Sequence, residues 1–305
     1  MNVSRRGFAA LAGLTALSAC STSNPLASPS SPAAGGGSGS GALVVGSQQY
    51  YSNEIIAELY AQVLEKAGLK VTRQYQIGQR EVYLPEILKG SIDVFPEYNG
   101  NLLQYLDKAA KVTDTASVQA ALSKALPSGL RVLAPADASD QDTYTTTQAF
   151  STQYGVTSLA DLSKVTKKLT IAANSEFATR PYGPSGLKAA YGVDITVVPV
   201  EDSGGPLTVK ALTDGKTDFA DIYSASPSII ANKLVVLEDP KSLILPQNVV
   251  PLVSAKVDTL AADAITKVNA QLSADDLRKL NAQSVNEQKK SADIAKAWLS
   301  SKGLI

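Results

Sequence analysis

Residues 90–101 read GSIDVFPEYNGN, and this stretch decides how the rest of the chain is organised. Its apolar run, residues 92–95, has the composition of a buried strand. The following segment, residues 96–100, is rich in turn-forming residues, so we expect the strand to end there in a turn. Ligands bind at the carboxyl ends of strands in open α/β sheets. Tyr98 is therefore placed at a candidate ligand site.

A second stretch, residues 215–223 (GKTDFADIY), repeats this design. In both copies a helix-like run precedes a glycine, an aspartate follows three positions later, and a tyrosine follows eight positions later. The matched spacing predicts two similar lobes, and each lobe presents a tyrosine, Tyr98 or Tyr223, from the end of a strand. Helix–glycine–strand junctions are common, so a chance match is the alternative interpretation.

The composition narrows the classes of function. The chain has 305 residues, enough for one large or two medium domains, and it carries 28 basic and 28 acidic side chains. This balance argues against a nucleic-acid-binding protein, which would be basic. The chain has no histidine and one cysteine. These counts exclude histidine-based triads, histidine or thiolate metal sites and an intrachain disulfide, and we expect no metal and no cofactor.

The first 41 residues have the features of an export signal and a tether. Residues 4–9 (SRRGFA) resemble the twin-arginine signal, although two arginines also suit an ordinary signal peptide. The apolar run that follows ends in LSAC, which resembles a lipobox, so we expect cleavage and lipidation at Cys20. An ordinary cleaved signal is the alternative. Residues 21–41 are rich in Ser, Pro, Gly and Ala, which predicts a flexible linker.

Strand and helix patterns alternate through the remaining chain. Apolar spacing predicts a helix from Asn53, as its cap, to Gly68. With its flanking strands and the predicted helix at residues 80–89, this gives a β-α-β-α-β order and a mostly parallel sheet. A second alternating region has predicted strands at residues 169–173, 195–200 and 219–222 and predicted helices at residues 187–191 and 207–213. Three further helices are expected at residues 263–272, 274–283 and 292–301.

Four tyrosines fall in predicted loops or at strand ends: Tyr50, Tyr98, Tyr144 and Tyr223. Tyrosine rings that face a cleft can enclose a quaternary ammonium group by cation–π contact, which contributes about 0.5–2 kcal/mol per ring. Such a cation has no N–H donor, so ring faces recognise it better than a pair of carboxylates would. The alternative is that these tyrosines pack in loops with hydrated hydroxyls.

Polar residues near these tyrosines could bind other parts of a ligand. Arg180 could hold a carboxylate with its guanidinium, whereas Gln48, Asn101 and Asp142 could supply hydrogen bonds. A solvated arginine in a loop is the alternative for Arg180. Residues 203–205 (SGG) lack the spacing of a phosphate-binding loop.

Several of these segments, in this order, resemble one family. They are VVGSQQ (residues 44–49), GSIDVFPEYNGN, the D-x-Y of residues 142–144, R-x-x-G-x-x-G-L-K-x-x-Y-G (residues 180–192) and GKTDFADIYS. The GSIDVFPEYNGN block is similar to the pattern G-x-I-D-x-x-P-E-Y-x-G-T. Residues 43–305 thus resemble the ProX-type substrate-binding lipoproteins of osmoprotectant ABC transporters, which bind glycine betaine, choline or carnitine.

The resemblance implies an α/β, two-lobed type II periplasmic-binding-protein fold with the ligand in a cleft between the lobes. Lobe I would comprise residues 43–144 plus 247–305, and lobe II residues 145–246. Family members hold the cation in a box of four tyrosines, and Tyr98, Tyr144 and Tyr223 stand at three matching positions. The resemblance also implies that Arg180 meets a ligand carboxylate and that Gln48 is a polar residue of the first binding loop.

Two positions depart from the family pattern. The fourth box tyrosine should follow Pro246, but this residue is Gln247, and Asn101 stands where the family has threonine or aspartate. An amide offers a donor and an acceptor, so a hydroxylated ligand, such as a polyol or a polyphenol-like compound, is the alternative to glycine betaine.

The leading hypothesis is a non-enzymatic, monomeric, lipid-anchored receptor on the extracytoplasmic face of the membrane. It would deliver a glycine betaine-like small molecule to an ABC permease and would bind no nucleic acid. An extracellular enzyme using Glu97, Asp142 and Asp221 as acid and base is one alternative, although no nucleophile motif supports it. A sensor or structural lipoprotein is another.

Overall fold

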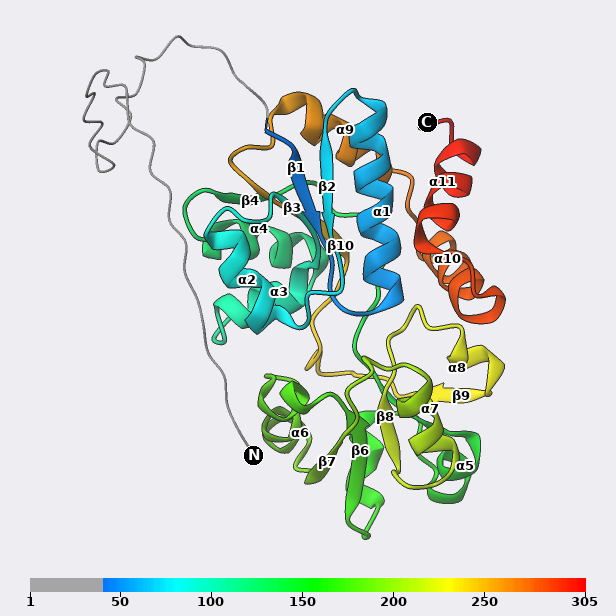
Figure 1. The fold of residues 1–305 in the computed structure, drawn as a ribbon. Coiled ribbons are helices and arrows are strands. Elements are labelled where there is room, and N and C mark those ends of the chain that lie inside the picture. The colour runs from blue at the N-terminus through cyan, green and yellow to red at the C-terminus, as the bar shows by residue number, and fades with distance from the viewer. Residues whose placement is uncertain (1–40) are drawn as a thin grey trace, which may run out of the picture. The chain divides into compact units, whose positions relative to one another are not determined.

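The computed structural model describes residues 41–305, which all belong to one unit of the chain. The predicted signal peptide, Cys20 and nearly all of the predicted linker lie outside the described residues. Two five-stranded sheets, each covered by helices, make up this unit (Figure 1). The α/β class predicted from the sequence is therefore confirmed. Within residues 41–305, no helix is both long enough and apolar enough to cross a membrane.

The first sheet and its helices are called lobe 1. Its strands are β1 (Leu43–Gly46), β2 (Val71–Gln74), β3 (Val94–Tyr98), β4 (Leu130–Val132) and β10 (Val249–Ser254). Their order in the sheet is β2-β1-β3-β10-β4, and β10 runs antiparallel to both of its neighbours. The helices are α1 (Tyr51–Lys66), α2 (Arg80–Leu88), α3 (Asn99–Leu106), α4 (Thr115–Ala125), α9 (Thr259–Asn269), α10 (Ala274–Glu287) and α11 (Ser291–Ser301).

The second sheet and its helices are called lobe 2. Its strands are β5 (Tyr144–Thr147), β6 (Leu169–Ala173), β7 (Ile195–Pro199), β8 (Phe219–Asp221) and β9 (Leu234–Val236). Their order is β7-β6-β8-β5-β9, with β5 antiparallel to both neighbours. The helices are α5 (Gln148–Tyr154), α6 (Pro184–Tyr191), α7 (Pro206–Thr213) and α8 (Ser228–Ala231), with short 3-10 helices η1 (Leu159–Lys164) and η2 (Ser175–Thr179).

Helix α1 is the central helix of lobe 1 and follows from its apolar spacing. Ile55, Ile56 and Leu59 are fully buried against the sheet and against α9 and α11. The predicted cap at Asn53 is wrong, because the helix already begins at Tyr51. Asn53 is instead buried. Its Oδ1 accepts a hydrogen bond from the Gln48 N–H at 2.8 Å, and its Nδ2 donates to the Pro96 carbonyl at 3.0 Å. This side chain thereby fixes the first binding loop to β3.

The turn predicted at residues 96–100 is also wrong. Residues 96–98 continue strand β3, and Asn99 begins helix α3. The proline is tolerated because β1 pairs with β3 only at Val94, and Pro96 lies opposite Pro251 in the antiparallel ladder with β10. The strand end therefore lies three residues later than the composition suggested, and Tyr98 is its last residue.

The matched spacing in residues 90–98 and 215–223 has a physical basis. The Asp93 carboxylate accepts a hydrogen bond from the Val44 N–H of β1 at 3.0 Å. In lobe 2 the Asp218 carboxylate accepts one from the Thr170 N–H of β6, also at 3.0 Å. Each aspartate therefore joins its own strand to the parallel neighbour by the same contact, as expected for two lobes of similar design.

The chain crosses between the lobes twice, along residues 133–143 and 237–248. The two crossings are joined to each other, because Ser139 and Asn248 form an antiparallel bridge and the Ser139 hydroxyl donates to the Gln247 carbonyl at 3.0 Å. The lobe boundaries expected at residues 144/145 and 246/247 remain a prediction.

Gly100 allows the second crossing to approach α3. Its N–H donates to the Pro246 carbonyl at 3.1 Å, and a Cβ at this position would lie 2.3 Å from that oxygen. We predict that Gly100→Ala lowers the free energy of unfolding by about 1–3 kcal/mol, because the crossing must move to relieve the overlap. Urea unfolding of the variant checks this. Gly41→Ala is the matched control, since a Cβ there meets nothing within 4 Å. Equal stability of the two variants would contradict the prediction.

Candidate functional site

One narrow cavity is lined by residues of both lobes and has a volume of about 30 Å³. Six of the eight ligand-binding residues predicted from the sequence line it: Gln48, Tyr98, Asn101, Asp142, Arg180 and Tyr223. The two others, Tyr144 and Gln247, do not line it. Tyr50, which the sequence analysis noted among the loop tyrosines, also lines it. The cavity further contains residues that the sequence analysis did not select for ligand binding: Gln79, Arg80, Asp140, Asn174, Glu176, Phe177, Tyr182 and Asp221.

Four tyrosines line the cavity: Tyr50, Tyr98, Tyr182 and Tyr223. The Tyr50 hydroxyl donates to that of Tyr98 at 2.8 Å, and the Tyr50 and Tyr223 rings meet edge to face with centroids 5.2 Å apart. Tyr98 comes from β3 in lobe 1, and Tyr223 follows β8 in lobe 2. The tyrosines of the two repeated segments thus meet at one cavity.

Tyr144 is a core residue of lobe 2 rather than a wall of this cavity. It is 1% exposed, its ring packs edge to face on Phe177, and its hydroxyl donates to the Tyr182 carbonyl at 2.7 Å. Tyr144 therefore holds the backbone of the residue whose ring does line the cavity. The available signal for Tyr182 was its place in the R-P-Y-G loop beside Arg180, which the sequence analysis did not weigh as a box position.

Gln247 lies behind the cavity wall and is 1% exposed. Its Oε1 accepts hydrogen bonds from the Asp142 N–H at 3.0 Å and from Asn101 Nδ2 at 3.1 Å. Its Nε2 donates to Asn101 Oδ1 at 2.9 Å, and Asn101 Nδ2 also donates to Asp142 Oδ2 at 2.8 Å. The Gln247 amide therefore uses both acceptor positions of its oxygen and one N–H to position two residues that face the cavity.

Both arginines of the cavity are already paired with carboxylates. Arg80 binds Glu97 in a bidentate manner, with Nε and Nη2 each 2.8 Å from a carboxylate oxygen. Glu97 is fully buried and also accepts from the Tyr83 hydroxyl and the Tyr98 N–H. Arg180 reaches across from lobe 2 to Glu81 of α2 at 2.9 Å. The first pair is a structural anchor, whereas the second joins the lobes at the cavity.

Three buried aspartates add negative charge to the cavity: Asp140, Asp142 and Asp221. Burial raises the pKa of Asp140 to about 6, although hydrogen bonds from Ser52 and the Ala225 N–H oppose this rise. Burial also raises the pKa of Asp221 well above its ordinary value, and the adjacent Asp142 carboxyl group raises it further. The cavity is therefore an environment in which a positive charge is favourable.

A second contact between the lobes lies beside the cavity, since Gln79 and Asn174 belong both to this contact and to the cavity lining. Ser203, in a loop of lobe 2, receives hydrogen bonds at its hydroxyl oxygen from Gln49 Nε2 and Gln79 Nε2 of lobe 1, each at 3.2 Å. Asn174 fixes this loop, because its Oδ1 accepts from the Ser203 N–H at 2.9 Å. The amide side chains of exposed Gln49 and half-buried Gln79 thus bridge two lobes whose connecting segments can act as a hinge.

Comparisons with known proteins match the chain to one family. A family model for the substrate-binding domain of the ABC-type glycine betaine transport system (OpuAC) matches residues 41–301. The glycine betaine-binding protein YehZ of Escherichia coli K12 is 26% identical over 274 residues, which are 85% of this chain and 90% of that protein. The carnitine transport binding protein OpuCC of Listeria monocytogenes is 23% identical over 87% of this chain and 88% of its own length.

Solved structures share the fold. A crystal structure described as a glycine betaine/carnitine/choline ABC transporter superposes with a TM-score of 0.70 at 22% identity, covering 86% of this chain and 99% of that chain. At this identity the match bears on the fold alone. The predicted two-lobed periplasmic-binding-protein fold is thereby confirmed.

Asp140 gives the site a measurable pH dependence. Its folded-state pKa of about 6 lies above the ordinary value of 3.8, so the native state binds more protons than the unfolded state between these values. The free energy of unfolding should therefore fall as the pH rises from about 4 to about 6. The free energy of unfolding of Asp140→Asn, relative to that of wild type, should therefore rise by about 2–3 kcal/mol over this interval, since one pKa unit corresponds to about 1.4 kcal/mol. Urea unfolding at pH 4 and pH 7 measures the gain, and a difference that does not change with pH would contradict it.

Proposed function

This chain belongs to the family of substrate-binding domains of ABC-type glycine betaine transport systems, and we propose that it binds a small quaternary ammonium compound in the cavity between its lobes. As a member of this family it is the extracytoplasmic receptor of an ABC importer, so its partners are a small-molecule ligand and a permease. The observation that carries the proposal is the group of four tyrosines around one cavity that also holds buried aspartates.

Several features support the proposal that the site recognises a methylated ammonium group of the ligand. Tyr50, Tyr98, Tyr182 and Tyr223 come from separate loops and strand ends of both lobes, so their ring faces can surround a cation only when the lobes are closed. Ligand binding would therefore stabilise the closed arrangement, and closure is the change that a permease can recognise. We propose that Gln48, Asn101, Asp142 and Arg180 form the polar part of the site.

A hydroxylated ligand is the less favoured alternative. It was suggested by an amide at position 247, but the Gln247 amide is bonded to Asn101 and Asp142 and does not line the cavity. We also propose that Tyr182 provides a ring to the box, whereas Tyr144 supports it from the core.

We propose that the protein binds its ligand without chemical conversion. The enzymatic alternative used Glu97, Asp142 and Asp221 as acid and base. Glu97 does not line the cavity and is held by Arg80, Tyr83 and the Tyr98 N–H. An acid or base must reach the substrate to act, which this arrangement denies to Glu97.

We further propose that lobe I comprises residues 43–144 plus 247–305 and that lobe II comprises residues 145–246. We also propose that lipidated Cys20 anchors a monomeric receptor to the membrane. The LSAC sequence and the export-signal features support this, with the twin-arginine route as one possibility. Cys20→Ser should release the protein from the membrane fraction into the extracytoplasmic soluble fraction. Retention of the variant in washed membranes would contradict the anchor.

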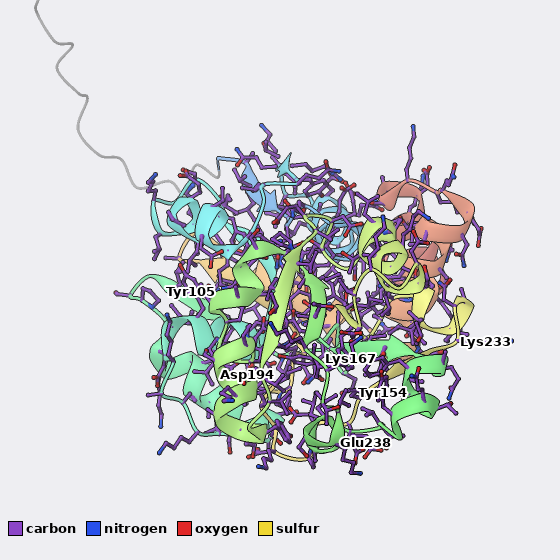
Figure 2. All side chains as sticks on the ribbon, turned by 90° about the horizontal axis from the view of Figure 1, so that it is seen from below. Tyr105, Tyr154, Lys167, Asp194, Lys233 and Glu238 are labelled. Carbon is purple, nitrogen blue, oxygen red and sulfur yellow. The ribbon has the colours of Figure 1, made fainter. Side chains whose placement is uncertain are left out.

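The box is tested by matched substitutions in one lobe. We predict that Tyr182→Leu weakens the binding of choline and glycine betaine by about tenfold or more, because it removes one aromatic face from the cation. The control is Tyr154→Leu (Tyr154 is labelled in Figure 2), since the Tyr154 ring packs on that of Phe150 in a tilted arrangement in the same lobe and does not line the cavity. Isothermal titration calorimetry measures both constants. Equal affinities for the two variants would contradict the box, and binding of neither ligand to wild type would contradict the proposed function.

A further inference from the structure

The charged groups of the cavity are unequally paired. Both of its arginines bind a carboxylate: Arg80 binds Glu97, and Arg180 binds Glu81. Four carboxylates line the same cavity: Asp140, Asp142, Glu176 and Asp221. Within residues 41–305, none of these four forms a salt bridge to lysine or arginine. The cavity thus contains carboxylates that have no cationic partner, whereas both of its arginines are already paired with a carboxylate.

Asp221 receives few hydrogen bonds for a buried aspartate. It ends strand β8 and is 6% exposed. In the described part of the chain only the Thr143 N–H donates to it, at 3.0 Å to Oδ1. Asp142 likewise receives one hydrogen bond, from Asn101 Nδ2 to its Oδ2. Asp140 receives the Ala225 N–H at its Oδ1. One carboxylate oxygen of Asp221 and one of Asp142 therefore remain for each other or for a group inside the cavity.

The immediate neighbour of Asp221 is another acid. The Asp142 carboxyl group lies within hydrogen-bonding reach of it, and Tyr182 and Tyr223 are close to both acids. Two carboxyl groups in this position repel each other when both are ionised, and a cation beside them relieves the repulsion. A ligand carboxylate in the same place would increase it. The acids and the two rings together therefore discriminate ligands by net charge.

We infer that Asp221, acting with Asp142, makes this site selective for quaternary ammonium ligands of net positive charge that carry a hydroxyl donor, over zwitterions with a carboxylate. The inference rests on the proposed function, because it concerns the same cavity and the same cation. Choline is the simplest ligand of the favoured class and glycine betaine the simplest of the other. Both carry a trimethylammonium group, so they differ only at the end that Asp221 and Asp142 would distinguish.

The test compares these two ligands by calorimetric titration of the purified full chain. Wild type should bind choline at least about tenfold more tightly than glycine betaine. Asp221→Asn keeps the shape of the side chain and an oxygen for the Thr143 N–H but removes the charge, and it should reduce this ratio by about tenfold. The matched control is Asp194→Asn. This control removes the same charge from an exposed side chain in the residue before β7, labelled in Figure 2. It should leave the ratio unchanged.

Tighter binding of glycine betaine than of choline by wild type would overturn the inference without any variant. An unchanged ratio in Asp221→Asn, with both ligands still bound, would also overturn it while leaving the proposed function intact. If Asp194→Asn reduced the choline-to-betaine affinity ratio by the same amount, the effect would be due to overall charge, and the role of Asp221 would be rejected. If wild type binds neither ligand, the proposed function fails and the inference fails with it.

Discussion

The hydrogen bonds of Gln247 are the constraint on which the site depends. This side chain sits on the second crossing between the lobes and accepts from the Asp142 N–H on the first crossing. Its amide also pairs with Asn101 at the start of α3. One buried amide therefore ties both crossings to lobe 1. Because an unsatisfied buried amide is costly, the three groups hold one another in a single arrangement and fix the direction in which Asp142 faces.

The remainder of the cavity is built on this fixed base from parts of two lobes. The Arg80–Glu97 pair is complete within lobe 1, so it belongs to the rigid part of the site. The contacts of Arg180 with Glu81 and of Ser203 with Gln49 cross between the lobes and are partly solvated. Contacts of the second kind contribute little each. Opening would therefore break weak contacts while it leaves the buried ion pair intact, which suits a receptor that must open and close.

Sequence patterns predicted the elements of the fold well, because helix and strand periodicity reflects burial against a sheet. Strand β6 and helices α7 and α11 lie within about one residue of their expected positions. The segment at residues 96–100 was assigned wrongly because composition does not reveal a partner strand, and β10 lies about 150 residues further along the chain.

Part of the site could be predicted from the sequence. The other residues could not, because their roles depend on the direction of each side chain in the folded protein. Tyr98 and Tyr223 were found because a repeated spacing placed them at equivalent strand ends. Tyr144 and Tyr182 could not be told apart, since the direction of a side chain depends on the tertiary contacts that put one ring into the core and the other into the cavity. Asp221 was noted only as a possible acid or base. Its environment became clear once β8 and the first crossing were placed together.

The most direct test of this account is a crystal structure of the protein with choline. We predict a trimethylammonium nitrogen within about 6 Å of the ring centroids of Tyr50, Tyr98, Tyr182 and Tyr223, with the hydroxyl directed to Asp142 and Asp221. The Tyr144 ring should remain in the core of lobe 2. A choline molecule that contacts the Tyr144 ring, or one bound outside this cavity, would contradict the account.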